Sequence, residues 1–254
     1  MGMTAGGFIW YELLTSDVEA ATRFYGDVVG WKMTGRGSVP GYLQFAAADS
    51  EIGGMMAMPR EAGFAGPVWL GYIHVPDVDA CAAAMQRDGG TVCMPPTDLA
   101  GVGRMAMMRD PQGAATYIMH PSMEGISRSF AAETGHCQWN ELVTSDPVAA
   151  TDFYTRHVGW RRGEVMSMGP IGDYQFLLAG EQRLGAVMKR SQQGALPLWR
   201  FYFGVDDIDR GARAIASGGG RLLGELQQVP GGGYAAVAMD PQGAEFGIAG
   251  PRKA

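Results

Sequence analysis

The stretch that decides the fold is residues 10–31, WYELLTSDVEAATRFYGDVVGW, because it returns as residues 139–160, WNELVTSDPVAATDFYTRHVGW. When residues 8–31 are laid on residues 137–160, 14 of 24 positions are identical. The run DPQGA also occurs twice, at residues 110–114 and 240–244. Self-similarity over such a distance is the mark of a duplicated domain.

Each half also repeats one order of elements. An alternating, β-rich run leads to an aspartate in N-cap position, Asp17, and the helix that follows ends at Gly30. A second helix opens at Asp77 or Asp79 and ends at Gly89. The apolar runs expected to form strands in the first half are 8–14, 31–34, 42–47, 52–58, 68–75, the run around Val92, 103–108 and 115–119. The pattern predicts βαβββ twice in each half, and so an α+β protein of four βαβββ modules.

Domain boundaries follow from the repeat. A length of 254 residues favours two domains. We expect an N-terminal domain over residues 1–120 and a C-terminal domain over residues 136–254, each with two modules. Residues 121–135, which contain Ser, Gly and Glu and have no counterpart, are expected to be the linker.

Composition excludes several classes of protein. The net charge of −6 and the lack of Lys and Arg clusters argue against nucleic acid or a membrane surface as partner. The three cysteines, Cys81, Cys93 and Cys137, are too scattered for a disulfide framework or a thiolate zinc site. No apolar run reaches the length of a signal peptide or a membrane span. We expect a cytoplasmic protein, a monomer or a homodimer.

These motifs resemble those of one superfamily. The pattern of a strand leading into Thr-Ser-Asp, a helix closed by Gly-Trp and a final Asp-Pro-Gln-Gly hairpin is similar to the vicinal oxygen chelate superfamily of glyoxalases, bleomycin-resistance proteins and extradiol dioxygenases. The exact sequences of these motifs look like those of a two-domain glyoxalase-like subgroup, some members of which are labelled hydroxylases. The resemblance covers about residues 8–119 and 137–249. It implies two open barrels of eight strands, each around a cavity, but the superfamily spans isomerases, dioxygenases, thiol transferases and binding proteins.

The resemblance also implies where metal ligands would stand, on inward positions of the first and last strand of a module. In this sequence those positions hold Trp10, Leu70, Tyr117, Trp139, Arg200 and Gly247. None of these is a usual ligand of a divalent metal ion. We therefore expect no cofactor, and any divalent metal would need other side chains.

Strand alternation predicts which side chains share the inward face with those positions. In the first half they are Trp10, Glu12, Tyr72, His74 and Tyr117. In the second half they are Trp139, Glu141, Arg200, Tyr202 and Glu245, together with Gly247. Aromatic walls with a few polar groups are typical of a small-molecule pocket.

More than one interpretation stays open for each of these candidates. Glu12 and Glu141 either stabilise their barrels, act as general base or ligand anchor, or hold a metal. His74 is either structural, an acid or base, or the partner of Glu12 in an incomplete metal site. Arg200 either pairs with Glu245 or Glu141, or clamps an anionic ligand. The two tryptophans of the inward face, Trp10 and Trp139, either stack on a flat ligand or fill the barrel.

Our first hypothesis is a binding protein of the bleomycin-resistance type that holds a small aromatic or hydrophobic molecule without the usual metal ligands. The alternative is an enzyme, a glyoxalase-like lyase or isomerase or an oxygenase, that uses Glu12 with His74 or Glu141 with Arg200. In a third reading the tryptophans close the cavities and the chain is an interaction module.

Overall fold

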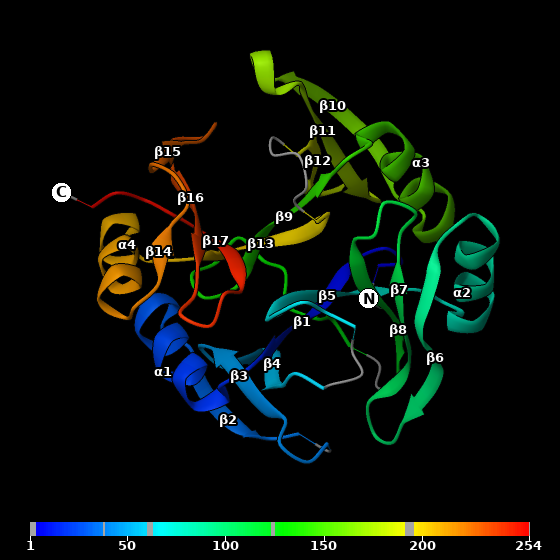
Figure 1. Cartoon of the computed structure of the whole chain (residues 1–254), viewed down its shortest axis with the longest axis horizontal. Coiled ribbons are helices and arrows are strands. Elements are labelled where there is room, and N and C mark those ends of the chain that lie inside the picture. Colours follow the sequence, from blue (N-terminus) through cyan, green and yellow to red (C-terminus); the bar gives the residue numbers. More distant parts are fainter. Residues whose placement is uncertain (1–3, 38, 60–62, 123–124, 191–195, 254) are drawn as a thin grey trace. The chain divides into compact units, whose positions relative to one another are not determined.

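The structure is a computed structural model that describes residues 4–37, 39–59, 63–122, 125–190 and 196–253 (Figure 1). Its elements follow the predicted order of four βαβββ modules. The first module consists of β1 (Phe8–Thr15), α1 (Val18–Val29), β2 (Lys32–Arg36), β3 (Leu43–Ala47) and β4 (Ser50–Ala57). The second consists of β5 (Val68–His74), α2 (Val78–Arg87), β6 (Thr91–Leu99), β7 (Gly103–Arg109) and β8 (Ala115–Pro121).

The second half repeats this order with two small additions. The third module consists of β9 (Cys137–Thr144), α3 (Pro147–Val158), β10 (Arg161–Ser167), the 3-10 turn η2 (Gly169–Ile171), β11 (Asp173–Ala179) and β12 (Gln182–Lys189). The fourth consists of β13 (Leu198–Gly204), α4 (Ile208–Ser217), β14 (Arg221–Leu222), β15 (Gln227–Gln228), β16 (Tyr234–Met239) and β17 (Glu245–Gly250). The prediction of an α+β fold with four such modules is confirmed.

The strands form two sheets, one for each half of the sequence. The first has eight strands in the order β2-β3-β4-β1-β5-β8-β7-β6, and the second has nine, in the order β10-β11-β12-β9-β13-β17-β16-β14, with β15 paired to β16. Within a module the first and last strands pair in parallel, as β1 does with β4 and β5 with β8, while the remaining pairs are antiparallel. These two sheets agree with the predicted pair of open, barrel-like domains.

In the described residues each α-helix begins at an aspartate, as predicted for α1 and α2. Oδ1 of Asp17 accepts a hydrogen bond of 2.9 Å from the backbone N–H of Ala20, which satisfies one of the free donors of the helix N-terminus. Asp77 caps α2 in the same way, so Asp77 and not Asp79 is the N-cap of this helix. Gly30, at φ 91°, ends α1 in the left-handed conformation that favours glycine.

Two compact units emerge from the contacts, and each is built from both halves of the sequence. Unit 1 comprises residues 1–9, 70–127 and 140–199, and unit 2 comprises residues 10–69, 128–139 and 200–254. Unit 1 therefore holds nearly all of the second and third modules, and unit 2 nearly all of the first and fourth, while the first two or three residues of β1, β5, β9 and β13 belong to the other unit. The predicted boundaries at 1–120 and 136–254 follow the repeat and stay a prediction. Met123 and Glu124 of the predicted linker lie outside the described residues.

Tryptophans fill the core of each unit. In unit 2 the ring of Trp31 stacks on Phe45 at 4.1 Å between centroids and meets Phe203 edge-on at 4.7 Å. In unit 1 Trp160 stacks on Tyr154 at 5.1 Å and meets Trp199 edge-on at 5.6 Å. The two tryptophans that follow the first helix of each half are buried, which explains why both halves keep them.

A buried chain of hydrogen bonds recurs in both units. In unit 2 Trp69 Nε1 donates to the hydroxyl of Tyr25 at 2.9 Å, and that hydroxyl donates to Oδ2 of Asp240 at 3.0 Å. Oδ1 of Asp240 accepts three backbone N–H groups of its own turn, those of residues 242–244. In unit 1 the equivalent residues are Trp199, Tyr154 and Asp110. The repeated Asp-Pro-Gln-Gly turn is thus tied to a tyrosine of the other half.

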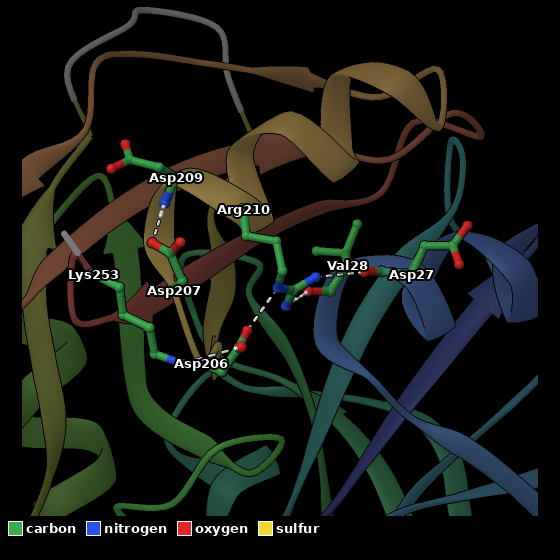
Figure 2. Close-up of polar contacts among 7 residues, drawn as sticks. All are labelled: Asp27, Val28, Asp206, Asp207, Asp209, Arg210 and Lys253. Atoms are coloured by element: carbon green, nitrogen blue, oxygen red, sulfur yellow. Dashed lines mark hydrogen bonds and ion pairs between the residues drawn. The ribbon is translucent and has the colours of Figure 1, made fainter.

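A basic side chain caps the C-terminus of α1 in unit 2 (Figure 2). Arg210, on α4, donates to the carbonyl oxygens of Asp27 at 2.8 Å and Val28 at 3.0 Å, and to Oδ1 of Asp206 at 2.6 Å. Lys253 Nζ lies 3.4 Å from the other oxygen of Asp206. A cation at the last carbonyls of a helix is favourable, so this contact helps to hold α1 against α4.

The helices found in the described residues are all too short or too polar to cross a membrane.

Candidate functional site

Two tyrosines meet on one face of the β5–β8 pair in unit 1. Tyr72 on β5 lies directly opposite Tyr117 on β8, and their rings stack at 4.3 Å between centroids with 22° between their planes. On β7, Met107 stands opposite Tyr117, and Met105 stands opposite Met119 of β8. We call this set, Tyr72, Tyr117, Met105, Met107 and Met119, the Tyr–Met face.

The two sides of this sheet differ in their access to solvent. All five residues of the Tyr–Met face keep an exposed fraction of 5–7 %. The residues that alternate with them, Ile73, Ala106, Met108, Thr116 and Ile118, are at 0 %. Both sets are buried, and the Tyr–Met face differs from the second set only in keeping a small exposed fraction. Leu70, the candidate at the start of the same face, is fully buried and belongs to the core.

His74 lies at the end of β5, beside the Tyr–Met face. Its Nδ1 is 3.3 Å from the carbonyl oxygen of Thr4, and its ring stacks on that of His120 at 5.6 Å. Burial lowers the pKa of His74 below its usual value, and the nearby His120 lowers it further, while the Thr4 carbonyl raises it. The neutral imidazole is therefore favoured at this position.

Glu141 holds a tyrosine in unit 1. Oε2 of this buried carboxylate, on β9, accepts a hydrogen bond of 2.6 Å from the hydroxyl of Tyr174 on β11. A short bond from a hydroxyl to a carboxylate is among the stronger hydrogen bonds of a protein interior. This contact accounts for the burial of Glu141 and gives Tyr174 a fixed position that the sequence alone did not reveal.

Arg200 and Glu245 form an ion pair in unit 2. Nε of Arg200 donates to Oε1 of Glu245 at 2.7 Å, and Nη2 of the same guanidinium contacts the same oxygen. The side chains are only partly exposed, at 14 % for Arg200 and 21 % for Glu245. Of the partners considered for Arg200, Glu245 is thus in contact with it.

Tyr202 lies over a glycine next to this ion pair. Tyr202 on β13 stands opposite Gly247 on β17, and a Cβ added at residue 247 would come within 2.2 Å of Cδ1 of the ring. Only a residue without a side chain allows the ring to lie this close to the neighbouring strand. Gly247 therefore shapes the position of Tyr202.

The first strand of unit 2 carries Trp10 and Glu12. Nε1 of the half-buried Trp10 donates to the hydroxyl of Tyr42 at 2.7 Å. Glu12 is buried and stands opposite Gly54 of β4, where an added Cβ would meet the ring of Tyr42 at 2.3 Å. Trp139, the matching tryptophan of the second half, is half-buried, and its carbonyl oxygen accepts a hydrogen bond from Cys137 Sγ at 3.3 Å.

The candidates thus divide between the units. Tyr72 and Tyr117 are brought together in unit 1, and Arg200, Glu245 and Tyr202 in unit 2. In the first predicted pair, Glu12 belongs to unit 2 and His74 to unit 1. In the second, Glu141 belongs to unit 1 and Arg200 to unit 2. The predicted roles of these two pairs stay predictions.

Tyr42 and Tyr174 are the residues that sequence reasoning missed. Tyr174 stands opposite Met188 of β12, and Tyr42 directly precedes Leu43, which stands opposite Met55 of β4. The two tyrosines therefore occupy equivalent places in the first and third modules. The spacing between them differs from the repeat offset, so a direct overlay of the halves does not align them.

The residues do not fit the metal ion that the resemblance implies. The six ligand positions hold three aromatic rings, a leucine, a glycine and an arginine that pairs with Glu245, and only Tyr117 among them offers an oxygen. Within the described ranges, no group of three or more His, Cys, Asp or Glu side chains could hold a metal ion. That the protein works without a metal stays a prediction.

Comparison with known proteins identifies relatives over nearly the whole chain. A protein of Mycobacterium tuberculosis with the provisional name glyoxylase CFP32 is 35 % identical over 249 residues, covering 95 % of this chain and 94 % of its own. The anthracycline biosynthesis protein DnrV of Streptomyces peucetius is 31 % identical over 268 residues, covering 96 % and 92 %.

Solved structures show the same fold at low identity. The Mn(II)-bound glyoxalase of Novosphingobium aromaticivorans matches with a TM-score of 0.68 at 17 % identity, over 100 % of this chain and 84 % of its own. The 2,3-dioxygenase LapB of Pseudomonas sp. KL28 matches with a TM-score of 0.64 at 18 % identity, over 100 % and 94 %. At this identity the likeness establishes the fold alone.

The model of one family matches residues 7–116 and 134–248, which are the two repeats found in the sequence. Together with the relatives above, this match confirms the resemblance: the chain belongs to the glyoxalase/bleomycin resistance protein/dioxygenase superfamily.

Proposed function

We propose that the protein binds a small, flat, apolar aromatic molecule on the Tyr–Met face of unit 1. The observation that carries this proposal is the stacked pair of Tyr72 and Tyr117, with methionines beside it, on the side of the sheet that is slightly less buried than the other. Aromatic rings offer large contact area and prefer stacked or edge-on neighbours, so a planar ligand suits them. Methionine side chains adapt to the outline of a ligand.

The charge pattern of this face supports an apolar ligand. All five of its residues are uncharged, and Ala115, which begins β8 two residues before Tyr117, is also apolar. A charged or strongly polar ligand would lose its hydration here without regaining hydrogen bonds. The name of the relative DnrV, an anthracycline biosynthesis protein, is in keeping with work on small organic molecules.

We propose further that the partner is a small molecule, with nucleic acid and membrane excluded by the acidic charge balance, and that the protein works in the cytoplasm. The net charge of −6 carries the first part of this proposal.

A thermal-shift titration tests the binding proposal. The probes are 2-methoxynaphthalene, which is planar and aromatic, and decalin, which has a similar fused two-ring carbon frame but is neither. A ligand at 100 times its dissociation constant adds about 2.7 kcal/mol to the free energy of unfolding. We expect 2-methoxynaphthalene to raise the melting temperature and decalin to raise it much less. Equal shifts from both probes would contradict stacking on the tyrosines.

A second candidate function is an enzyme, a glyoxalase-like lyase or isomerase or an oxygenase, that uses Glu12 with His74 or Glu141 with Arg200. The observation in its favour is that Glu12 and Glu141 are both buried carboxylates at the middle of a first strand. Turnover of a hemithioacetal or a catechol that is lost in Glu12→Gln or Glu141→Gln, while the melting temperature is kept, would favour this candidate over a binding protein.

A further inference from the structure

Unit 2 carries the counterpart of the Tyr–Met face, with different chemistry. The pair Tyr202 and Gly247 on β13 and β17 occupies the register of Tyr72 and Tyr117 on β5 and β8, at an offset of 130 residues. On the third strand Val237 stands opposite Gly247, as Met107 stands opposite Tyr117. The two modules therefore present the same framework, and the side chains on it can be compared position by position.

We call Arg200, Tyr202, Glu245 and Gly247 the unit 2 face. Two of its positions carry charged side chains where unit 1 has apolar ones. Arg200 stands where unit 1 has Leu70, and Glu245 stands where unit 1 has Ala115. The two form the ion pair described above, and neither side chain is fully buried. Removing an ion pair from water costs free energy, which its mutual attraction and hydrogen bonds offset only in part. The difference between the modules thus lies in polar groups placed beside an aromatic ring.

This face keeps partial contact with solvent along its third strand. In β16 the residues on the same side as Glu245, which are Ala235, Val237 and Met239, are partly exposed, while Ala236 and Ala238 between them are buried. Met239 stands directly opposite Glu245 in the antiparallel register. A molecule lying against the unit 2 face would therefore touch Met239 and Glu245 together.

Glu245 keeps one acceptor available. The two contacts from Arg200 to Glu245 go to Oε1, and within the described residues no hydrogen bond reaches Oε2. A carboxylate oxygen is an acceptor only, and a hydroxyl that donates to it forms a charge-assisted hydrogen bond. Because Arg200 already pairs with Glu245, a neutral donor can bond the carboxylate without changing the charge of the ion pair.

We infer that unit 2 holds a second ligand site, separate from the Tyr–Met face, that takes a planar aromatic molecule with a hydroxyl group, a phenol. Its ring lies against Tyr202, and its hydroxyl donates to Oε2 of Glu245. Gly247 is the specificity-determining position, since a side chain there would displace the ring of Tyr202. This inference does not depend on the apolar ligand proposed for unit 1.

Methionine NMR separates the two sites in one experiment. With ¹³C-methyl methionine, the signals of Met105, Met107 and Met119 report the Tyr–Met face, and that of Met239 reports the unit 2 face. The probes are 2-naphthol and 2-methoxynaphthalene, its methyl ether, in which a methyl group replaces the hydrogen of the hydroxyl donor. We expect Met239 to shift with 2-naphthol at a dissociation constant on the order of ten times lower than with 2-methoxynaphthalene, because a hydrogen bond to a charged group is worth roughly 1.5–3 kcal/mol.

The matched variant carries the unit 1 residues at both charged positions, Arg200→Leu together with Glu245→Ala. It removes the ion pair as a whole, so no charge is left without its partner. We expect Met239 to lose its preference for 2-naphthol, while the three methionines of the Tyr–Met face respond as before. An unchanged preference at Met239, or no response of Met239 to 2-naphthol in the native protein, would overturn the second site. Silence of Met105, Met107 and Met119 alone would count against the unit 1 proposal instead.

Discussion

The hydroxyl of Tyr25 donates a hydrogen bond of 3.0 Å to Oδ2 of Asp240, a residue 215 positions later in the chain. In unit 1 the same relationship joins Tyr154 to Asp110 at 3.3 Å. Both bonds are buried, and each links a module of one half to a module of the other. The identities that reveal the duplication in the sequence are thus, in part, the residues that hold each compact unit together.

Removal of the tyrosine hydroxyl is expected to destabilise the protein. Burial raises the pKa of Asp240 and of Tyr25, so both groups depend on this bond for compensation. Tyr25→Phe leaves Oδ2 of a buried carboxyl without its donor, which costs about 1–3 kcal/mol. Urea unfolding measures the loss, and a double-mutant cycle with Asp240→Asn isolates the coupling. A coupling near zero would contradict a direct role of the bond.

Glu141→Gln separates a structural role of this carboxylate from a role in binding. The substitution removes the charge that accepts the 2.6 Å bond from Tyr174, and we expect a loss of roughly 1–3 kcal/mol in the free energy of unfolding. Tyr174→Phe is the matched variant, because it deletes the same bond from the other side. If binding of 2-methoxynaphthalene falls in Glu141→Gln but not in Tyr174→Phe, Glu141 acts on the ligand and not only on its tyrosine.

The free energy of unfolding is expected to decrease as the pH is lowered below about 6.5, the ordinary pKa of histidine. His74 accounts for part of this decrease. Burial lowers the pKa of His74 in the folded protein, with His120 acting in the same direction. The unfolded chain therefore takes up its proton first as the pH falls, and the free energy of unfolding decreases through this range. His74→Gln, which keeps a donor for the Thr4 carbonyl, should flatten the curve between pH 7.5 and about 5.5.

Burial also lowers the pKa of His157 in unit 1, and Asp88 raises it in part. Part of the dependence of the free energy of unfolding on pH should therefore remain in His74→Gln. Parallel curves for this variant and the native protein would show that His74 does not contribute.

Protein purified without added metal should contain no stoichiometric divalent ion. The reason is the donor set, since the six positions equated with metal ligands offer the oxygen of Tyr117 as the single neutral or anionic donor. Elemental analysis by mass spectrometry measures the content, and dialysis against a chelator should leave the melting temperature unchanged. One equivalent of manganese, iron or zinc that survives gel filtration would contradict this reading.

The module pattern could be read from the sequence because local signals agree. Asp17, Asp77 and Asp146 cap their helices as expected, and Gly113, at φ 106°, takes the turn conformation that the Asp-Pro-Gln-Gly motif predicts. Such signals act over a few residues, so a single sequence contains them.

The make-up of the compact units could not be read in this way. Nothing near Tyr25 in the sequence points to Asp240, and sequence proximity favours a domain made of neighbouring modules. The one available signal was indirect: Tyr25 and Asp110 each recur in the other half, as Tyr154 and Asp240, although neither stands at a position expected to carry chemistry. Side-chain partners of Glu141 and Trp10 were hidden for the same reason, because Tyr174 and Tyr42 come from another strand.

The central claim, that Tyr72 and Tyr117 hold a flat aromatic molecule, is tested most directly by the dissociation constant of 2-methoxynaphthalene, measured by isothermal titration. Tyr117→Leu keeps an apolar side chain of moderate size but removes the stacked ring. Tyr202→Leu is the control, since it makes the same change to the tyrosine of the unit 2 face, which stands at the place equivalent to Tyr72. We predict that Tyr117→Leu raises the dissociation constant about ten-fold, in line with roughly 0.5–1.5 kcal/mol for an aromatic pair plus lost contact area, while the tightest binding survives in Tyr202→Leu. Unchanged affinity in Tyr117→Leu, with the fold intact, would contradict the account.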